Sequence, residues 1–253
     1  MRKKAGYLFL AVVLLAGCLR EEKPLLIVGS SCMGRAMRIL AEGSPWEVEV
    51  QLGGTQLGLT ALKEGRADLA ACSRALGEED EGIEAFLLAS DAIGVAVHPS
   101  NSIQKLSREQ LRAVYEGEIT DWSELGGDSG PIAAIGRESG SGTRSAFESA
   151  LGIKTPVYSQ ELGETGIVRT AVAGCPGAIG YLSAAYADGS VRLLSVDEIL
   201  PTEEAVRDGS YPLTRPFLLC RRAGDFDEKL CRFLSYAQKD GAALLKSAGF
   251  FTE

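Results

Sequence analysis

Short apolar runs in this chain repeatedly end in glycine- or serine-rich turns, and helix-forming residues follow those turns. Strands are expected over residues 25–28, 48–52 and 132–135, and each is followed by a loop and a helix. This order of strand, tight loop and helix favours an α/β architecture with largely parallel sheets. Ligands of such sheets bind at the carboxyl ends of the strands, against the N-termini of the following helices. The glycine loops are therefore the expected binding positions.

The alternation of strands and helices continues along the rest of the chain, which we expect to form two lobes. The pattern of residues changes after Pro99, and the earlier pattern resumes near Arg215. We therefore expect one lobe built from residues 25–98 and 212–253, with a second lobe, residues 99–211, inserted into it. A capping box formed by Ser107 and Gln110 is expected to start a helix. Further strands are expected over residues 68–72, 93–97, 178–182, 191–194 and 216–221, and helices over 36–41, 57–64, 144–151 and 227–247, the last interrupted near Gly241.

The N-terminus indicates export. A basic segment at residues 2–4 precedes an apolar run that is shorter than the ~20 residues of a membrane-spanning helix, so residues 1–17 have the form of a signal peptide. The run ends in Leu-Ala-Gly followed by Cys18, which resembles the lipobox of bacterial and archaeal lipoproteins, where the cysteine carries the lipid. Residues 18–24 would then form a tether. The alternative is an ordinary secretory leader with an incidental cysteine.

Charge and composition exclude several classes of protein. The chain carries 26 basic and 34 acidic residues, a net charge of −8, and loss of residues 1–17 leaves 23 basic residues. No basic cluster is interleaved with aromatic residues, so nucleic acid is not an expected partner. A single histidine, His98, and the lack of a CxxC pair argue against a metal site, and we expect no cofactor. No serine lies in a nucleophile elbow, so we do not expect an enzyme.

Apart from Cys18 the chain has five cysteines, an odd number in a compartment that often permits disulfide bonds. At least one must therefore stay free or pair with another chain. Cys220 and Cys231 fit the role of small buried hydrophobic side chains, and the sequence also leaves open a bridge between them.

The sharpest local signal is the segment 137–143, which follows an expected strand and opens an expected helix. Its glycines let the backbone approach a ligand, and free N–H groups at the helix N-terminus point outward. The hydroxyl groups of Ser141 and Thr143 add donors, and Arg137 can bind an oxyanion through two nitrogens. The segment does not match a P-loop, so nucleotide hydrolysis is not expected. The alternative is a loop that only caps a helix.

Two further loops share this design. Residues 29–31 (Gly-Ser-Ser) and 53–55 (Gly-Gly-Thr) each follow an expected strand and precede an expected helix. If the three loops converge, their helix dipoles and hydroxyl groups can stabilise a buried oxyanion without much formal charge. An anion site is therefore compatible with an acidic chain.

These segments resemble the phosphate-binding component of high-affinity phosphate ABC transporters, the PstS type of periplasmic binding protein. The resemblance spans most of the mature chain and is most specific in the arginine-containing glycine loop and in the string Gly-Glu-Ile-Thr-Asp-Trp at residues 117–122. It also includes residues 67–70 with the following Ser-Arg pair, the segment 91–97, and Pro-Gly-Ala-Ile-Gly-Tyr at residues 176–181.

This resemblance implies a type II periplasmic binding protein fold, with the second lobe inserted into the first and the ligand cleft between them. Such a protein closes on inorganic phosphate and delivers it to the permease subunits of an ABC transporter. It would act as a monomer outside the cytoplasm, attached to the cell membrane through a lipid on Cys18. The resemblance assigns the anion contacts to Ser31, the backbone of Cys32, Thr55, Arg137, Ser141, Gly142 and Thr143.

The chain departs from the family pattern at three positions. Cys32 stands where a threonine, valine or aromatic residue is more usual, and Gln56 lies in a turn that is usually richer in glycine and serine. Arg74 stands where some relatives have an aspartate. Its guanidinium group could contact the anion at the edge of the site, or a local carboxylate such as Glu78 or Glu79.

Selectivity for phosphate has a physical basis, because phosphate near neutral pH carries a proton that sulfate lacks. A buried carboxylate can accept the hydrogen bond of that proton and disfavour sulfate. Asp91 is the first candidate for this role and Asp68 the second, although a strand-end bond to a backbone N–H is the favoured alternative for Asp68. The competing functions are binding of another oxyanion (sulfate, molybdate or tungstate) and a sensor or adhesion lipoprotein with a vestigial anion site.

Overall fold

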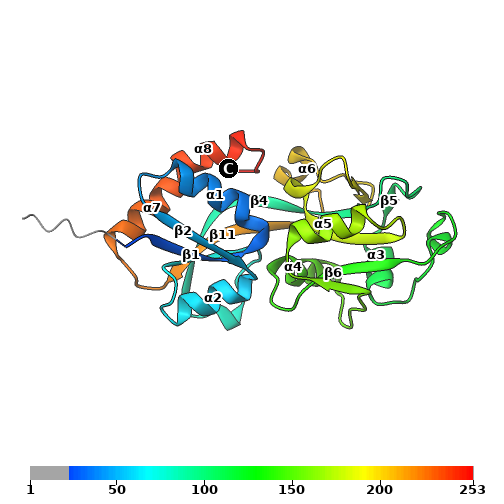
Figure 1. Ribbon diagram of the computed structural model, residues 1–253, viewed down its shortest axis with the longest axis horizontal. Helices are drawn as coiled ribbons and strands as arrows, with labels where there is room; N and C mark the ends of the chain where they lie inside the picture. The colour runs from blue at the N-terminus through cyan, green and yellow to red at the C-terminus, as the bar shows by residue number, and fades with distance from the viewer. Residues whose placement is uncertain (1–22, 253) are drawn as a thin grey trace, which may run out of the picture.

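The computed structural model describes residues 23–252, so the expected signal peptide and Cys18 lie outside the described residues. Two lobes lie side by side along the long axis of the molecule, and the C-terminus lies on the first lobe (Figure 1). No helix in the described part of the chain is both long and apolar enough to cross a membrane.

The strands alternate with helices as the sequence predicted. A continuous sheet of nine strands runs through both lobes, and a separate pair of short strands lies in the second lobe. The strands are β1 (Leu25–Ser30), β2 (Val48–Gly53), β3 (Leu69–Cys72), β4 (Ile83–Val97), β5 (Lys105–Leu106), β6 (Ala133–Arg137), β7 (Gln160–Leu162), β8 (Ala178–Ser183), β9 (Arg192–Leu193), β10 (Ser195–Val196) and β11 (Thr214–Arg222). Their order in the large sheet is β2-β1-β3-β11-β4-β8-β6-β7, with β9 beside β4.

The large sheet is parallel within each lobe and antiparallel where the lobes join. β1 is parallel to β2 and β3, and β6 is parallel to β7 and β8. β11 and β4 run antiparallel to each other and to their other neighbours. The glycine loops follow the carboxyl ends of parallel strands in both lobes, β1 and β2 in the first and β6 in the second.

β4 joins the two lobes because its two halves pair with different strands. Up to Ala92 it pairs with β11, and from Ile93 onward it pairs with β8 and β9. β11 carries the chain back into the first lobe, so the second lobe is inserted into the first and the molecule has the two-lobed architecture of a periplasmic binding protein (Figure 1). The division points expected at residues 98 and 212 stay predictions, since the change of pairing lies inside β4.

The helices begin at the loops that the sequence singled out. The capping box is confirmed, because Gln110 N–H donates to Ser107 Oγ at 3.1 Å and Ser107 N–H donates to the Gln110 side chain at 2.8 Å. The helices are α1 (Gly34–Gly43), α2 (Thr55–Lys63), α3 (Arg108–Tyr115), α4 (Gly142–Leu151), α5 (Thr165–Ala173), α6 (Glu203–Arg207), α7 (Glu228–Gln238) and α8 (Asp240–Ser247), with 3-10 turns η1 (Ser31–Met33), η2 (Glu78–Asp80), η3 (Trp122–Leu125) and η4 (Ala184–Tyr186). The sequence pattern had predicted neither α5 nor the first half of β4.

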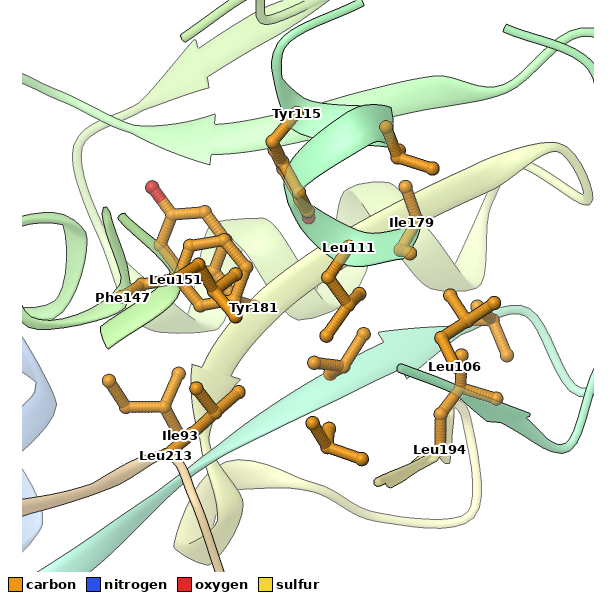
Figure 2. Close-up of a cluster of buried hydrophobic side chains, with 14 of the residues drawn as sticks. Ile93, Leu106, Leu111, Tyr115, Phe147, Leu151, Ile179, Tyr181, Leu194 and Leu213 are labelled. Atoms are coloured by element: carbon orange, nitrogen blue, oxygen red, sulfur yellow. The ribbon is translucent and has the colours of Figure 1, made fainter. Parts of the chain in front are cut away.

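Each lobe has its own apolar core. In the first lobe, Met33 and Leu40 pack against the helices that end the chain. In the second, Tyr115, Phe147 and Tyr181 form an aromatic group, in which the rings of Phe147 and Tyr181 stack with centroids 4.0 Å apart (Figure 2). The apolar cores of the two lobes are therefore separate, and β4 and β11 pass between the lobes.

The cysteines of the described chain are all free thiols. The bridge between Cys220 and Cys231 that the sequence left open is therefore not formed in this part of the chain. Cys231 Sγ lies 3.3 Å from Arg221 Nη1, whereas Cys220 is buried beside Cys72 in the first lobe.

Candidate anion-binding site

The three glycine loops converge at the junction of the two lobes. Arg137 Nη2 donates to Ser31 Oγ at 3.2 Å, which joins the loop after β6 to the loop after β1. Gln56 N–H donates to the carbonyl of Gly140 at 3.1 Å, which joins α2 to the loop before α4. A Cβ atom added to Gly142 would lie only 2.2 Å from Thr55 Oγ1. Segments far apart in the sequence therefore meet at one place, which is the convergence on which the anion-site hypothesis depends.

The first lobe contributes a hydroxyl cluster, formed by Ser30, Thr55 and Ser73. Ser30 Oγ lies 2.8 Å from Ser73 Oγ, and Ser73 Oγ lies 3.3 Å from Thr55 Oγ1. The thiol of Cys32 lies 3.1 Å from Ser30 Oγ, and all four side chains are buried. A hydroxyl group can turn its hydrogen toward an anion, so the cluster is a set of adjustable donors.

Neither Ser30 nor Ser73 was among the residues that the sequence assigned to the site. Each lies at the carboxyl end of a parallel strand, β1 for Ser30 and β3 for Ser73. That position is the signal that could have identified them, because ligands of parallel sheets bind there.

The second lobe contributes the N-terminus of α4. Ser141 caps this helix through a 3.4 Å hydrogen bond from Arg144 N–H to its Oγ. The N–H groups of Gly142 and Thr143 belong to the first turn, where no intrahelical acceptor exists. Thr143 Oγ1 is buried and has no hydrogen-bond partner among the described residues. Unused donors and the positive end of a helix dipole are the features that favour binding of a small anion.

Arg137 supplies the positive charge between the two sets of donors. Its side chain is only 1% exposed, and it is held by Nη1 to Thr165 Oγ1 at 3.1 Å and by Nη2 to the carbonyl of Gly163 at 2.9 Å. Glu138 accepts from Nε at 2.9 Å and from Nη2 at 2.8 Å. Thr165 and Glu138 were not foreseen from the sequence. The guanidinium group is thus fixed in place, and Glu138 offsets part of its charge.

The backbone of Arg137 is anchored to the aromatic core of the second lobe. Its N–H donates to the hydroxyl of Tyr181 at 3.1 Å, and its carbonyl accepts from Arg144 Nη1 at 2.9 Å. Burial raises the pKa of Tyr181 to about 12, so the phenol stays neutral and remains a hydrogen-bonding partner. The stacked ring of Phe147 in turn fixes Tyr181 (Figure 2). The anion site therefore rests on a rigid base.

Arg74 adopts the second of the two arrangements that the sequence left open. Its Nη1 donates to Asp80 Oδ2 at 2.6 Å, and its Nη2 lies 3.5 Å from the carboxylate of Glu79. Although Ser73 of the hydroxyl cluster is the preceding residue, these contacts direct the guanidinium group of Arg74 toward the acidic residues of η2. These contacts do not support the anion-binding role expected for Arg74; its charge instead ties η2 to the end of β3.

Asp68 and Asp91, the two carboxylates considered for selectivity, are both engaged elsewhere. Asp68 Oδ2 accepts from the backbone N–H of Leu26 at 2.8 Å, which is the strand-end role that was favoured for it. Asp91 accepts from Ser183 Oγ at 2.6 Å and from Arg215 through Nε at 2.9 Å and Nη2 at 2.7 Å. Both oxygens of Asp91 thus have partners, so its contacts do not support direct acceptance of the phosphate proton.

A hollow of about 590 Å³ lies in the second lobe, away from the glycine loops. Trp122, Pro131 and Cys175 are among the residues that line it, and the glycine loops are not. A small anion needs closely spaced donors rather than a large apolar volume, so the junction of the lobes fits an anion better than this hollow does.

Comparison with known proteins agrees with this geometry. A family model described as a PBP superfamily domain matches residues 20–238. The chain is 34% identical over 208 residues to the phosphate-binding protein PstS of Bacillus subtilis, a match that covers 76% of this chain and 69% of that relative. It is 26% identical over 215 residues to a protein of the same name from Borreliella burgdorferi, covering 78% of this chain and 76% of the relative.

Solved structures give the same result. A phosphate ABC transporter substrate-binding protein with bound phosphate from Clostridium perfringens has a TM-score of 0.87 at 31% sequence identity, covering 91% of this chain and all of that one. An ABC-type phosphate transport receptor from Vibrio cholerae has a TM-score of 0.77 at 31% identity, covering 90% of this chain and all of that one. The chain therefore belongs to the PBP superfamily and, within it, to the PstS family of phosphate-binding proteins.

Proposed function

We propose that this protein captures inorganic phosphate outside the cytoplasm and delivers it to the permease of an ABC transporter. The observation that carries the proposal is the convergence of unused donors from both lobes around Arg137, with the buried hydroxyl of Thr143 lacking a protein partner. The relatives named above, one of them solved with bound phosphate, support the choice of ligand.

The groups that would hold phosphate come from both sides of the cleft. The first lobe offers Ser31, the backbone of Cys32 and Thr55; the second offers Arg137 and the start of α4 at residues 141–143. Binding would therefore favour the closed arrangement, because only closure brings both sets to one anion. Opening of the lobes at the permease would remove half of the donors and release the ligand.

This role requires no bond to form or break. Members of the family are the substrate-binding components of transporters, and the site is built from donors that stabilise an anion rather than from a nucleophile and a base. We propose that the protein acts as a monomeric binding protein and not as an enzyme.

Isothermal titration calorimetry tests the proposed ligand. The chain that follows Cys18 would be unfolded and refolded to remove any bound anion, then titrated with phosphate, sulfate and molybdate. We expect micromolar or tighter binding of phosphate, about 8 kcal/mol or more of binding free energy, and far weaker binding of sulfate. Tighter binding of another oxyanion would make the ligand assignment wrong. Absence of any binding would favour a protein partner instead.

We further propose that the protein is attached to the membrane through a lipid on Cys18. Cys18 lies outside the described residues, so the proposal rests on the Leu-Ala-Gly-Cys string and the preceding basic and apolar segments. Cells grown with a labelled lipid precursor should incorporate label into the wild-type protein and not into Cys18→Ser. Label retained by the variant would contradict the anchor, and Cys231→Ser serves as a control that should stay labelled.

A further inference from the structure

A buried ion pair lies where the two lobes join. Asp91 on β4 and Arg215 on β11 are register partners, and their side chains are 3% and 2% exposed. Ser183, at the end of β8, donates to the second oxygen of Asp91 at 2.6 Å. The pair therefore links the strands that pass between the lobes to a strand of the second lobe.

Arg215 also contacts the first-lobe wall of the anion site. Its Nη1 lies 3.5 Å from the carbonyl of Ser73, whose hydroxyl belongs to the hydroxyl cluster. The hydroxyl of Ser73 lies 2.8 Å from Ser30 Oγ, next to the assigned anion contact Ser31. Burial works against charge on Arg215, but the carboxylate of Asp91 opposes this effect, and the pKa of the guanidinium lies above its usual value. Arg215 is therefore a permanent buried cation beside the site.

The charge of Arg215 reaches the anion position without direct contact. Ser73 Oγ would lie 2.5 Å from a Cβ added to Gly142, so the residue that touches Arg215 also touches the start of α4. Charges act over several ångströms in a buried, weakly polarisable environment. Each arginine has part of its charge offset by a carboxylate, Arg137 by Glu138 at 2.8 Å and Arg215 by Asp91 at 2.7 Å. A second cation behind Ser73 would therefore contribute to attraction of the anion.

We propose that Arg215 is a second cation of the anion site, a positioning residue that acts through Ser73, and that Asp91 limits how much of its charge the anion experiences. This inference rests on the proposed binding of phosphate. It assigns Asp91 a role opposite to that of a proton acceptor: Asp91 neutralises Arg215 instead of contacting the ligand.

The two roles of Asp91 predict opposite results for Asp91→Asn. If Asp91 accepts the proton of phosphate, the variant loses phosphate affinity and sulfate affinity changes little. If Asp91 neutralises Arg215, the variant leaves the cation uncompensated and binds both phosphate and sulfate more tightly, by roughly 3- to 10-fold. The sign of the change separates the two roles.

The experiment measures phosphate and sulfate affinity by calorimetry for the mature chain and its variants. We expect Arg215→Gln to weaken phosphate binding by about tenfold or more and Arg215→Lys to recover part of the loss, since the lysine restores the charge but not the pair of bonds to Asp91. Arg221→Gln is the matched control, because Arg221 lies on the same strand but pairs with Glu84 at 2.7 Å. Its affinity should equal that of the wild type.

Single variants of a buried ion pair are strongly destabilised, so thermal unfolding is recorded for each one. The double variant Asp91→Asn/Arg215→Gln removes both charges and leaves no unpaired ion, so it keeps the test decisive if a single variant fails to fold. It should bind more tightly than Arg215→Gln, which leaves the negative charge of Asp91 unpaired, and less tightly than the wild type. Wild-type affinity in the folded double variant, or equal weakening by Asp91→Asn and Arg215→Gln, would overturn the inference. Failure of the wild type to bind phosphate would instead reject the proposed function.

Discussion

Replacement of Arg137 by glutamine is expected to lower phosphate affinity by about 100-fold or more. Arg137 is buried and donates to Ser31 across the junction of the lobes, so its loss removes both a positive charge at the proposed site and a bond between the lobes. The variant also leaves the carboxylate of Glu138 without its partner beside the anion, which adds repulsion. Calorimetric titration with phosphate measures the effect.

Two further variants show whether charge or shape is responsible. Arg137→Lys keeps a positive charge but loses the planar guanidinium group that Thr165 and Gly163 hold, so we expect an intermediate affinity. Arg112→Gln removes an exposed arginine of the same lobe that pairs only loosely with Glu116, at 4.0 Å, and should bind like the wild type. Undiminished phosphate binding by a folded Arg137→Gln protein would be incompatible with the proposed site.

Gly142→Ala is expected to weaken phosphate binding by preventing the lobes from closing fully. The added Cβ would lie 2.2 Å from Thr55 Oγ1 and 2.5 Å from Ser73 Oγ, distances that real contacts do not reach. Overpacking of this kind costs about 1 to 3 kcal/mol, or roughly 5- to 150-fold in affinity. Alanine is well tolerated in a helix, so each separate lobe should keep its stability.

Gly166→Ala provides the matched control for this prediction. Gly166 also lies in the first turn of a helix of the second lobe, α5, but a Cβ added there meets nothing within 4 Å. Affinity should fall only in Gly142→Ala, and small-angle scattering with saturating phosphate should show a less compact molecule for that variant alone. Equal affinities of the two variants would show that the closed arrangement does not bring Thr55 against α4.

Several features of the fold could be predicted because they depend on neighbouring residues. The capping box of Ser107 and Gln110 needs only two side chains three positions apart, and it forms as expected. The glycine loops after β1, β2 and β6 are also local, since a strand, a turn and a helix start follow one another in the chain. The convergence of these loops could be inferred as well, because α/β topology places the carboxyl ends of strands at one edge.

The features that could not be predicted depend on contacts between distant segments. The first half of β4 has no clear alternation of polar and apolar residues, and its pairing with β11 decides that it is a strand. Thr165 and α5 carried no recognised motif, yet α5 begins where its first residue meets Arg137. Arg74 had two acidic neighbours and a nearby binding site as rival partners, and only the folded position of Asp80 decides between them.

The sequence by itself determined the α/β class, the two lobes, and the glycine loops with Arg137 as candidates for an anion site, because each depends on local order and on the chemistry of single residue types. The tertiary structure decided which charges face which partners. Asp91 was the expected acceptor of the phosphate proton until the pairing of β4 with β11 placed Arg215 against it. Electrostatic roles depend on distances of a few ångströms between segments that lie far apart in the chain, and only packing fixes those distances.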